Sequence, residues 1–169
     1  FPYTTLFRSK PDLDIKDFIH FDGNTGYGNI NILDAQILFQ KPTLYACFLL
    51  WLLETTYNTM PEVGDLNKPK LVFFFDEAHL LFDNISDNLC KKIIQIVKLI
   101  RSKGIGLYFI SQNPSDIPDE ILSQLGNRIQ HTLRSYTPAE EKSIKAAAKS
   151  YRQNPNFNTE EEIKKLKTG

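Results

Sequence analysis

The sequence predicts an α/β domain in which helices flank a mostly parallel sheet. Two short runs of consecutive apolar residues, 71–75 (LVFFF) and 105–110 (IGLYFI), have the length and composition of buried strands. Helical patterns lie before, between and after these runs. Strands that alternate with helices through short connections are typical of parallel sheets covered by helices on both faces.

The segment before the first apolar run is expected to hold a helical turn, a loop, a strand and a long helix. Residues 12–19 fit the turn, 21–29 (FDGNTGYGN) a Gly/Asn loop, and 30–33 a strand. Pro42 favours a helix start, and the run to about residue 58 is apolar on nearly every face. This helix is therefore predicted to be deeply buried.

The segment after the first apolar run is expected to be largely helical. Apolar residues at helical spacing predict an amphipathic helix that Gly104 ends; they are Leu89, Ile93, Ile96, Val97 and Ile100. Beyond the second strand, we expect a helix near 121–125, a third strand around 128–133, a helix after Pro138 and a charged helix over 160–167.

Length, charge and cysteine content limit the classes of protein to which this chain can belong. A chain of 169 residues suits one domain. The chain has 20 Lys plus Arg and 20 Asp plus Glu, so its net charge does not favour binding to nucleic acid or to an anionic membrane. The apolar run 44–53 is far shorter than the roughly 20 residues of a membrane helix. Cys47 and Cys90 lack metal-ligand spacing and are expected to be reduced core thiols of a cytoplasmic protein.

Two adjacent carboxylates, Asp76 and Glu77, directly follow the first apolar run. Parallel sheets bind ligands at the carboxyl ends of their strands, so this pair is the leading candidate site. We assign Asp76 to Mg²⁺ of a bound Mg-ATP, and Glu77 to the attacking water as its proton acceptor or orienting group. The alternative is that the pair only ends the strand and caps the next helix.

Gln112 follows the second apolar run and should lie at the same sheet edge if the strands are parallel. Its amide can donate to a phosphate oxygen and accept from water, which suits a γ-phosphate sensor; a structural loop amide is the alternative. Arg128 is a candidate arginine finger for a neighbouring subunit, with Arg134 as its competitor, although an ion-pairing role is common for a single Arg.

His79 and a basic stretch allow both structural and functional interpretations. His79 could polarise Glu77, but a lone His is more often a structural hydrogen-bonding residue, and the zinc motif H-E-x-x-H is absent. The basic stretch comprises Lys91, Lys92, Lys98, Arg101 and Lys103. It could contact a nucleic-acid backbone, but a solvated face of the amphipathic helix already explains it and is the favoured interpretation.

The sequence contains no phosphate-binding loop of the form G-x-x-x-x-G-K-[ST]. The only glycine cluster, residues 23–28, lacks the Lys and precedes a predicted strand rather than following one. Residues 1–9 (FPYTTLFRS) resemble the translation of a sequencing adapter and are expected to be a scar. We therefore expect the loop to lie upstream, and this chain alone to bind ATP weakly.

Three stretches, 68–83, 99–138 and 154–161, together resemble the HerA-like ATPases of the HerA–FtsK superfamily, and within it the bacterial YjgR-type helicases. The resemblance implies a partial RecA-like P-loop NTPase core over 10–150, without its P-loop half, and a helical tail over 151–169. It also implies ATP and Mg²⁺ as cofactors, a homo-oligomeric and commonly hexameric ring, and action on DNA.

By position, the resemblance matches Asp76 and Glu77 to the Walker B pair, Gln112 to the polar residue after the next strand, and Arg128 to an arginine after the small helix. A DEAH-box helicase is an alternative suggested by residues 76–79, but Ser-Ala-Thr would then be expected in place of SQN at 111–113. A non-catalytic interaction module is the third reading.

Overall fold

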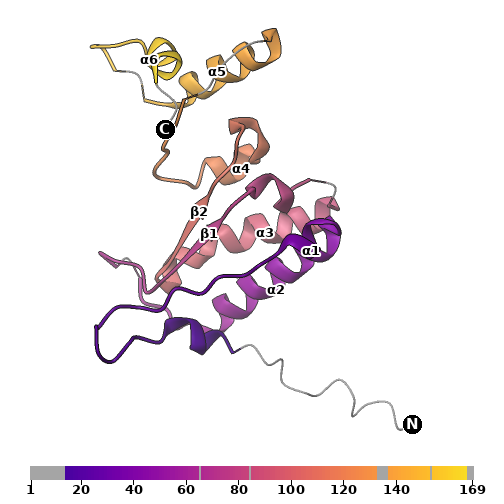
Figure 1. Ribbon diagram of the computed structural model, residues 1–169, viewed down its shortest axis with the longest axis vertical. Coiled ribbons are helices and arrows are strands. Elements are labelled where there is room, and N and C mark those ends of the chain that lie inside the picture. The colour runs from indigo at the N-terminus through magenta and orange to yellow at the C-terminus, as the bar shows by residue number, and fades with distance from the viewer. Residues whose placement is uncertain (1–13, 65, 84, 133–136, 153, 167–169) are drawn as a thin grey trace.

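The computed structural model describes residues 14–64, 66–83, 85–132, 137–152 and 154–166. Its larger part is a two-stranded sheet, β1 (Leu71–Phe75) and β2 (Ile105–Phe109), with helices α2 (Pro42–Thr59) and α3 (Asp87–Leu99) beside it (Figure 1). Two helices near the carboxyl terminus form the rest. This mixture of helices with parallel strands is compatible with the predicted α/β class.

Strands β1 and β2 pair in parallel over their whole length, with Phe74 opposite Tyr108 and Phe75 opposite Phe109. The rings of Phe75 and Phe109 stack with centroids 5.5 Å apart, and Phe75 belongs to the buried core. Phe74 and Tyr108 also stack, at 4.7 Å, but their side chains are 65% and 51% exposed. The prediction that helices cover both faces is therefore wrong for the described residues, because no described element covers Phe74 and Tyr108.

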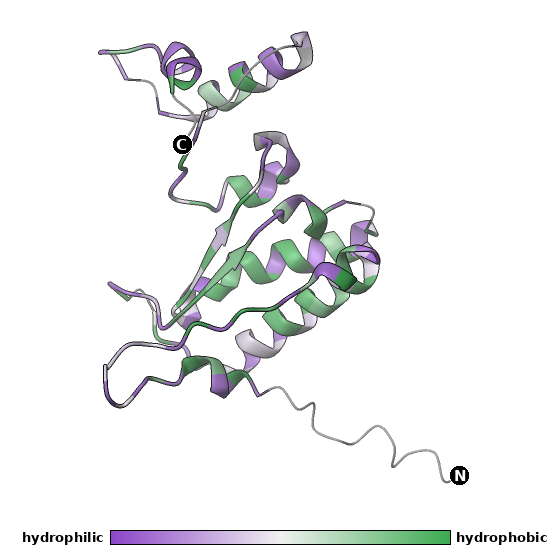
Figure 2. Ribbon diagram, viewed as in Figure 1, coloured by the Kyte–Doolittle hydropathy of each residue, from purple (hydrophilic) through white to green (hydrophobic). Residues whose placement is uncertain are grey.

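Helix α2 is the central element of the core. It begins at the predicted Pro42, and its apolar residues are the main partners of α3 and the turn after β1. Figure 2 shows the apolar residues concentrated in α2, α3 and the two strands. Cys47 on this helix is nevertheless exposed and Cys90 only partly buried, so the prediction of core thiols is wrong for Cys47. One side of the helix faces solvent, and the almost uniformly apolar sequence gives no indication of which side this is.

Helix α3 shows the predicted amphipathic pattern. The Ser86 hydroxyl caps its first turn by accepting from the Leu89 backbone N–H, and the buried side is formed by Ile93, Ile94 and Val97. The last turn tightens into a 3-10 segment, η3 (Ile100–Lys103), which Gly104 ends as predicted with φ of 72°. A Cβ at Gly104 would lie only 2.9 Å from Val63 Cγ2, so both conformation and space require glycine there.

Two predicted strands do not form in the described part of the chain. Residues 30–33 form no strand, and Ile30 and Ile32 are 90% and 89% exposed. Residues 128–132 also lack strand pairing, and 133–136, including Arg134, lie outside the described residues. A strand needs a neighbour to take its backbone hydrogen bonds, and no described segment supplies one to either stretch.

Short helical segments occupy the remaining connections. They are η1 (Ile15–Ile19), α1 (Gln36–Phe39), η2 (Ala78–Leu81), η4 (Pro114–Asp116) and α4 (Asp119–Leu122). The predicted turn near 12–19 and the helix near 121–125 correspond to η1 and α4. The glycine-rich loop closes through an isolated antiparallel bridge between Phe21 and Gly28.

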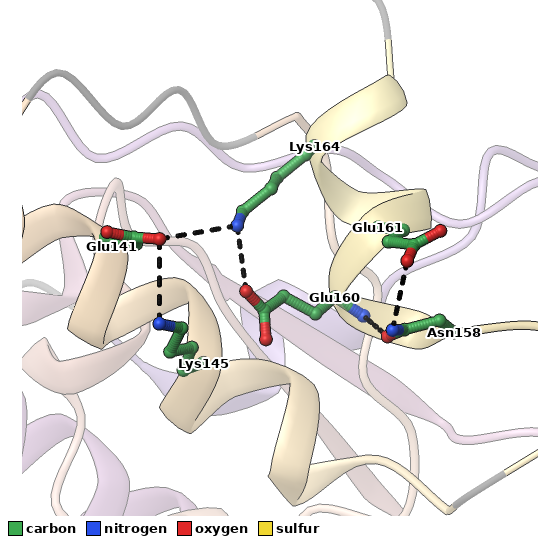
Figure 3. Close-up of polar contacts among 6 residues, drawn as sticks. All are labelled: Glu141, Lys145, Asn158, Glu160, Glu161 and Lys164. Carbon is green, nitrogen blue, oxygen red and sulfur yellow. Dashed lines mark hydrogen bonds and ion pairs between the residues drawn. The ribbon is translucent and has the colours of Figure 1, made fainter.

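The carboxy-terminal helices α5 (Pro138–Ser150) and α6 (Thr159–Lys165) pack against each other. Thr137 and Glu140 form a capping box at the start of α5. Lys164 on α6 joins the two helices through Glu141 of α5, which lies 3.8 Å from its Nζ, and it also pairs with Glu160 of α6 itself at 2.8 Å (Figure 3). Both helices are thus as predicted. The contact between the two helices crosses the predicted domain boundary at residue 150, and that boundary stays a prediction. Residues 1–13, which include the predicted scar, lie outside the described part.

Candidate active site

The pairing of β1 with β2 continues one step beyond the strands. The Ile110 N–H donates to the Phe75 carbonyl at 2.9 Å, and the Ala78 N–H donates to the Ile110 carbonyl at 2.9 Å. These two bonds hold the chain that leaves β1 beside the chain that leaves β2. The polar residues after both strands therefore share one edge of the sheet, as their parallel order requires.

Glu77 and Gln112, 35 residues apart in sequence, meet at this edge. The Gln112 Nε2 donates to Glu77 Oε1 at 2.9 Å. A carboxylate only accepts hydrogen bonds, so the nitrogen of the amide must face it. The predicted proximity of the two residues is thus seen in the structure, while their catalytic roles stay predictions.

The residues on either side of Gln112, Ser111 and Asn113, make hydrogen bonds within their own loop. The Ser111 hydroxyl donates to Asp116 Oδ2 at 2.6 Å, and Asn113 Oδ1 accepts from the Ser115 backbone N–H at the start of η4. Both contacts fix the loop after β2. Gln112 is left as the residue of the three whose side chain reaches the carboxylate.

Glu77 has an unusual backbone. Its φ and ψ are 48° and 49°, and it is the only non-glycine residue of the described part with positive φ. A non-glycine residue in this region costs about 1–3 kcal/mol, and such strain is frequent at functional sites. Glu77 directly precedes η2, yet its side chain makes no cap hydrogen bond. The alternative that Glu77 merely caps the next helix is therefore not supported.

Asp76 is exposed beside Glu77, and its Oδ1 accepts from the Glu77 backbone N–H at 3.0 Å. One solvent-accessible carboxylate suits Mg²⁺, which keeps several waters and is usually held by one or two carboxylates together with substrate phosphates. Among the described residues, no group of three His, Cys, Asp or Glu side chains forms an all-protein metal site.

Tyr45 of α2 is an electrostatic neighbour of Asp76 that sequence reasoning missed. Burial, and then the negative charge of Asp76, raise the pKa of the Tyr45 hydroxyl. The Tyr45 ring is held in the core by an edge contact with Phe39, at 5.2 Å between centroids. A tyrosine within an apolar helix gives no local signal, because only the fold brings it towards the strand end.

His79 lies on the other side of Glu77. Its Nδ1 is 3.3 Å from Glu77 Oε2, and the two side chains are 31% and 36% exposed. This contact does not count as a hydrogen bond, because Glu77 Oε2 is buried without a hydrogen-bond partner among the described residues. The structure thus brings together three of the residues considered from sequence: Glu77, Gln112 and His79.

Arg128 is engaged elsewhere. Its Nη2 donates to the Leu122 carbonyl at the end of α4, at 3.0 Å. Burial raises the pKa of Tyr151, and the positive charge of Arg128 opposes that rise. These contacts give Arg128 a structural task in this chain, and none of them joins it to Glu77 or Gln112. Its role towards a neighbouring subunit stays a prediction.

Part of the basic stretch on α3 and η3 is paired with acidic groups. Lys98 lies 3.9 Å from Glu120, and Lys103 lies 3.2 Å from Glu62. Lys103 also stands 4.8 Å from the centre of the Tyr57 ring. These contacts favour the interpretation of a solvated, ion-paired helix face.

Comparison with known proteins identifies the family. Residues 4–169 match the family described as Helicase HerA-like C-terminal. The chain belongs to this family. Its resemblance to HerA-like proteins, predicted from three stretches of sequence, is thereby confirmed.

Two relatives carry the name DNA double-strand break repair helicase HerA. The protein of Sulfurisphaera tokodaii is 35% identical over 88 residues, which cover 52% of this chain and 17% of the relative. The protein of Sulfolobus acidocaldarius is 27% identical over 120 residues, which cover 69% and 24%. The chain thus spans less than a quarter of the length of these relatives. No solved structure matches it significantly.

Membership in this family makes the chain part of a helicase-like ATPase group and favours the HerA-like reading over the DEAH-box alternative. Within the described residues, no helix is both long and apolar enough to cross a membrane.

Proposed function

We propose that this chain supplies the Walker B and sensor elements of an ATP-hydrolysing motor with a RecA-like core. The observation that carries the proposal is the 2.9 Å hydrogen bond between Gln112 and Glu77. It joins a carboxylate at the end of one strand to an amide at the end of its parallel neighbour. Ligands of such sheets bind at this edge.

The three residues take complementary parts in hydrolysis, and Glu77 and Gln112 act together through their hydrogen bond. Mg²⁺, when bound, neutralises charge on the β- and γ-phosphates, and Asp76 would hold it, partly through water. Glu77 accepts a proton from the attacking water or orients it in line with the γ-phosphate. Gln112 acts chiefly by orienting the Glu77 carboxylate through one amide hydrogen, and its second amide hydrogen is available to a phosphate oxygen.

Several features of the complete gene product follow from the family rather than from this site. We propose that it forms a homo-oligomeric ring, commonly hexameric, translocates or unwinds DNA, and obtains its phosphate-binding loop from sequence outside this chain. Arg128 remains the candidate finger for the next subunit. We further assign the protein to the YjgR type and to the cytoplasm, from the resemblance of 68–83 and 99–138 and from the two unpaired cysteines.

The test compares Glu77→Gln with the unaltered complete gene product in DNA-stimulated ATP hydrolysis. Glutamine keeps the size of the side chain but cannot accept the proton, so kcat should fall by a factor on the order of 10²–10⁴. Binding of Mg-nucleotide should be retained. Glu54→Gln, the same chemical change at an exposed position of α2, is the matched control and should leave kcat unaltered.

An unaltered kcat in Glu77→Gln contradicts the catalytic assignment. If the complete gene product binds no Mg-nucleotide in an equilibrium titration, the alternative of a non-catalytic interaction module is favoured.

A further inference from the structure

The two oxygens of the Glu77 carboxylate are held unequally. Oε1 accepts the hydrogen bond from Gln112. Oε2 is buried and accepts none from the described residues, although Nδ1 of His79 is only 3.3 Å away. A buried carboxylate oxygen without a donor is unfavourable, so the adjacent imidazole nitrogen has a clear electrostatic reason to turn towards it.

The turn that carries His79 is anchored to the core. Ala78 and Leu81 of η2 are each 1% exposed, and the His79 carbonyl accepts from the backbone N–H groups of Phe82 and Asp83, both at 2.9 Å. The backbone of His79 is therefore fixed next to the site. Its side chain is 31% exposed, so core packing alone does not account for an imidazole at this position.

The left-handed backbone of Glu77 brings the two side chains together. Glu77 turns the chain sharply from β1 into η2, and His79, two residues later, lies beside the carboxylate that Glu77 itself projects. Gln112 reaches the same carboxylate from the loop that follows β2. Two nitrogen groups from different elements thus flank one carboxylate, one at each oxygen.

We propose that His79 is a positioning residue for Glu77, a proposal that rests on the proposed role of Glu77 in hydrolysis. After a small turn of the imidazole from its position in the structure, Nδ1–H of His79 donates to Oε2 as Gln112 donates to Oε1, and together they fix the plane of the carboxylate. Each oxygen keeps a free lone pair, because a carboxylate has about four acceptor sites. The carboxylate therefore stays able to receive the proton of water while its orientation is held.

The test places a donor at one or the other imidazole nitrogen in the complete gene product. In His79→Asn, the amide nitrogen stands close to the position of Nδ1, whereas in His79→Gln it stands close to Nε2. We expect kcat for ATP hydrolysis to stay within about threefold in the Asn variant. In the Gln variant kcat should fall about tenfold to a hundredfold, as is typical when a hydrogen-bonding group that orients another functional side chain is lost. KM for ATP should be unaltered in both, because the contact acts on the water rather than on nucleotide binding.

A second comparison separates this proposal from the proposed function. If His79 acts through Glu77, His79→Gln should lower kcat no further in a protein that already carries Glu77→Gln. Equal kcat in His79→Asn and His79→Gln, or an additional full loss in the double variant, overturns the role of His79 even when Glu77→Gln alone is inactive. If Glu77→Gln is itself fully active, the proposed function fails, and the proposal for His79 fails with it.

Discussion

Replacement of Gln112 by Leu removes the amide that bridges the two strand ends while keeping a side chain of similar length. The lost hydrogen bond is 2.9 Å long and has a charged acceptor, but Glu77 is 36% exposed, so its contribution to the free energy of unfolding should be about 1 kcal/mol. For a chain of this size such a loss lowers the melting temperature by roughly 2–4 °C. The variant should therefore remain folded.

The effect of Gln112→Leu on turnover should be much larger than its effect on stability. Loss of one preorganised donor from a site where charge develops typically lowers kcat by about 10²-fold. At about 1.36 kcal/mol for each factor of ten, this amounts to roughly 2.7 kcal/mol of the barrier. Steady-state ATP hydrolysis and thermal unfolding of the complete gene product would measure both quantities.

A matched control is Gln95→Leu, the same substitution at an exposed position of α3. It should alter neither turnover nor melting temperature appreciably. A kcat for Gln112→Leu within twofold of the unaltered protein would refute the assignment of Gln112. So would equal losses of kcat in Gln112→Leu and in the Gln95 control.

Two further predictions concern the scaffold and are checked by denaturant unfolding. Ile93 is fully buried on α3, so Ile93→Ala should lower the free energy of unfolding by about 2–5 kcal/mol, whereas Lys92→Ala on the exposed side should change it by less than about 0.5 kcal/mol. Gly104→Ala should lower the free energy of unfolding by about 1–3 kcal/mol, because Ala disfavours positive φ and its Cβ would press on Val63. Gly23→Ala should lower it much less, because the added Cβ would meet no atom within 4 Å. A similar loss in each pair of variants would contradict these packing assignments.

The sheet edge could be predicted from sequence because its signals are local and strong. Five consecutive apolar residues indicate a buried strand at 71–75, and the helix between the two runs is typical of a parallel crossover connection. Parallel strands end at the same edge, so a parallel arrangement predicts that Glu77 and Gln112 lie close together. The structure adds the direct hydrogen bond, which no spacing rule contains.

Other parts of the fold could not be predicted because they depend on partners. The stretches 30–33 and 128–133 have strand-like sequences, but the described residues offer no neighbouring edge to pair with 30–33 or 128–132. The apolar run 71–75 likewise predicts burial on both faces, yet the face of Phe74 stays open here. Local propensity reports what a segment favours, whereas pairing depends on what lies beside it.

The contacts around the site could likewise not be predicted from the local sequence. Tyr45 comes near Asp76 through the packing of α2, and the contact of Arg128 with the Leu122 carbonyl depends on where α4 ends. The closeness of His79 to Glu77 depends on the left-handed backbone of Glu77, a conformation that its residue type does not favour. These features arise from tertiary structure, so they appear only in three dimensions.

The most direct test of the central claim, that Glu77 and Gln112 act as one unit, is a double-mutant cycle on kcat for ATP hydrolysis by the complete gene product. The cycle compares Glu77→Gln, Gln112→Leu and the double variant with the unaltered protein. We predict that the double variant is no slower than Glu77→Gln alone, because Gln112 acts largely through the carboxylate to which it is bonded. Independent losses that multiply in the double variant would contradict the account.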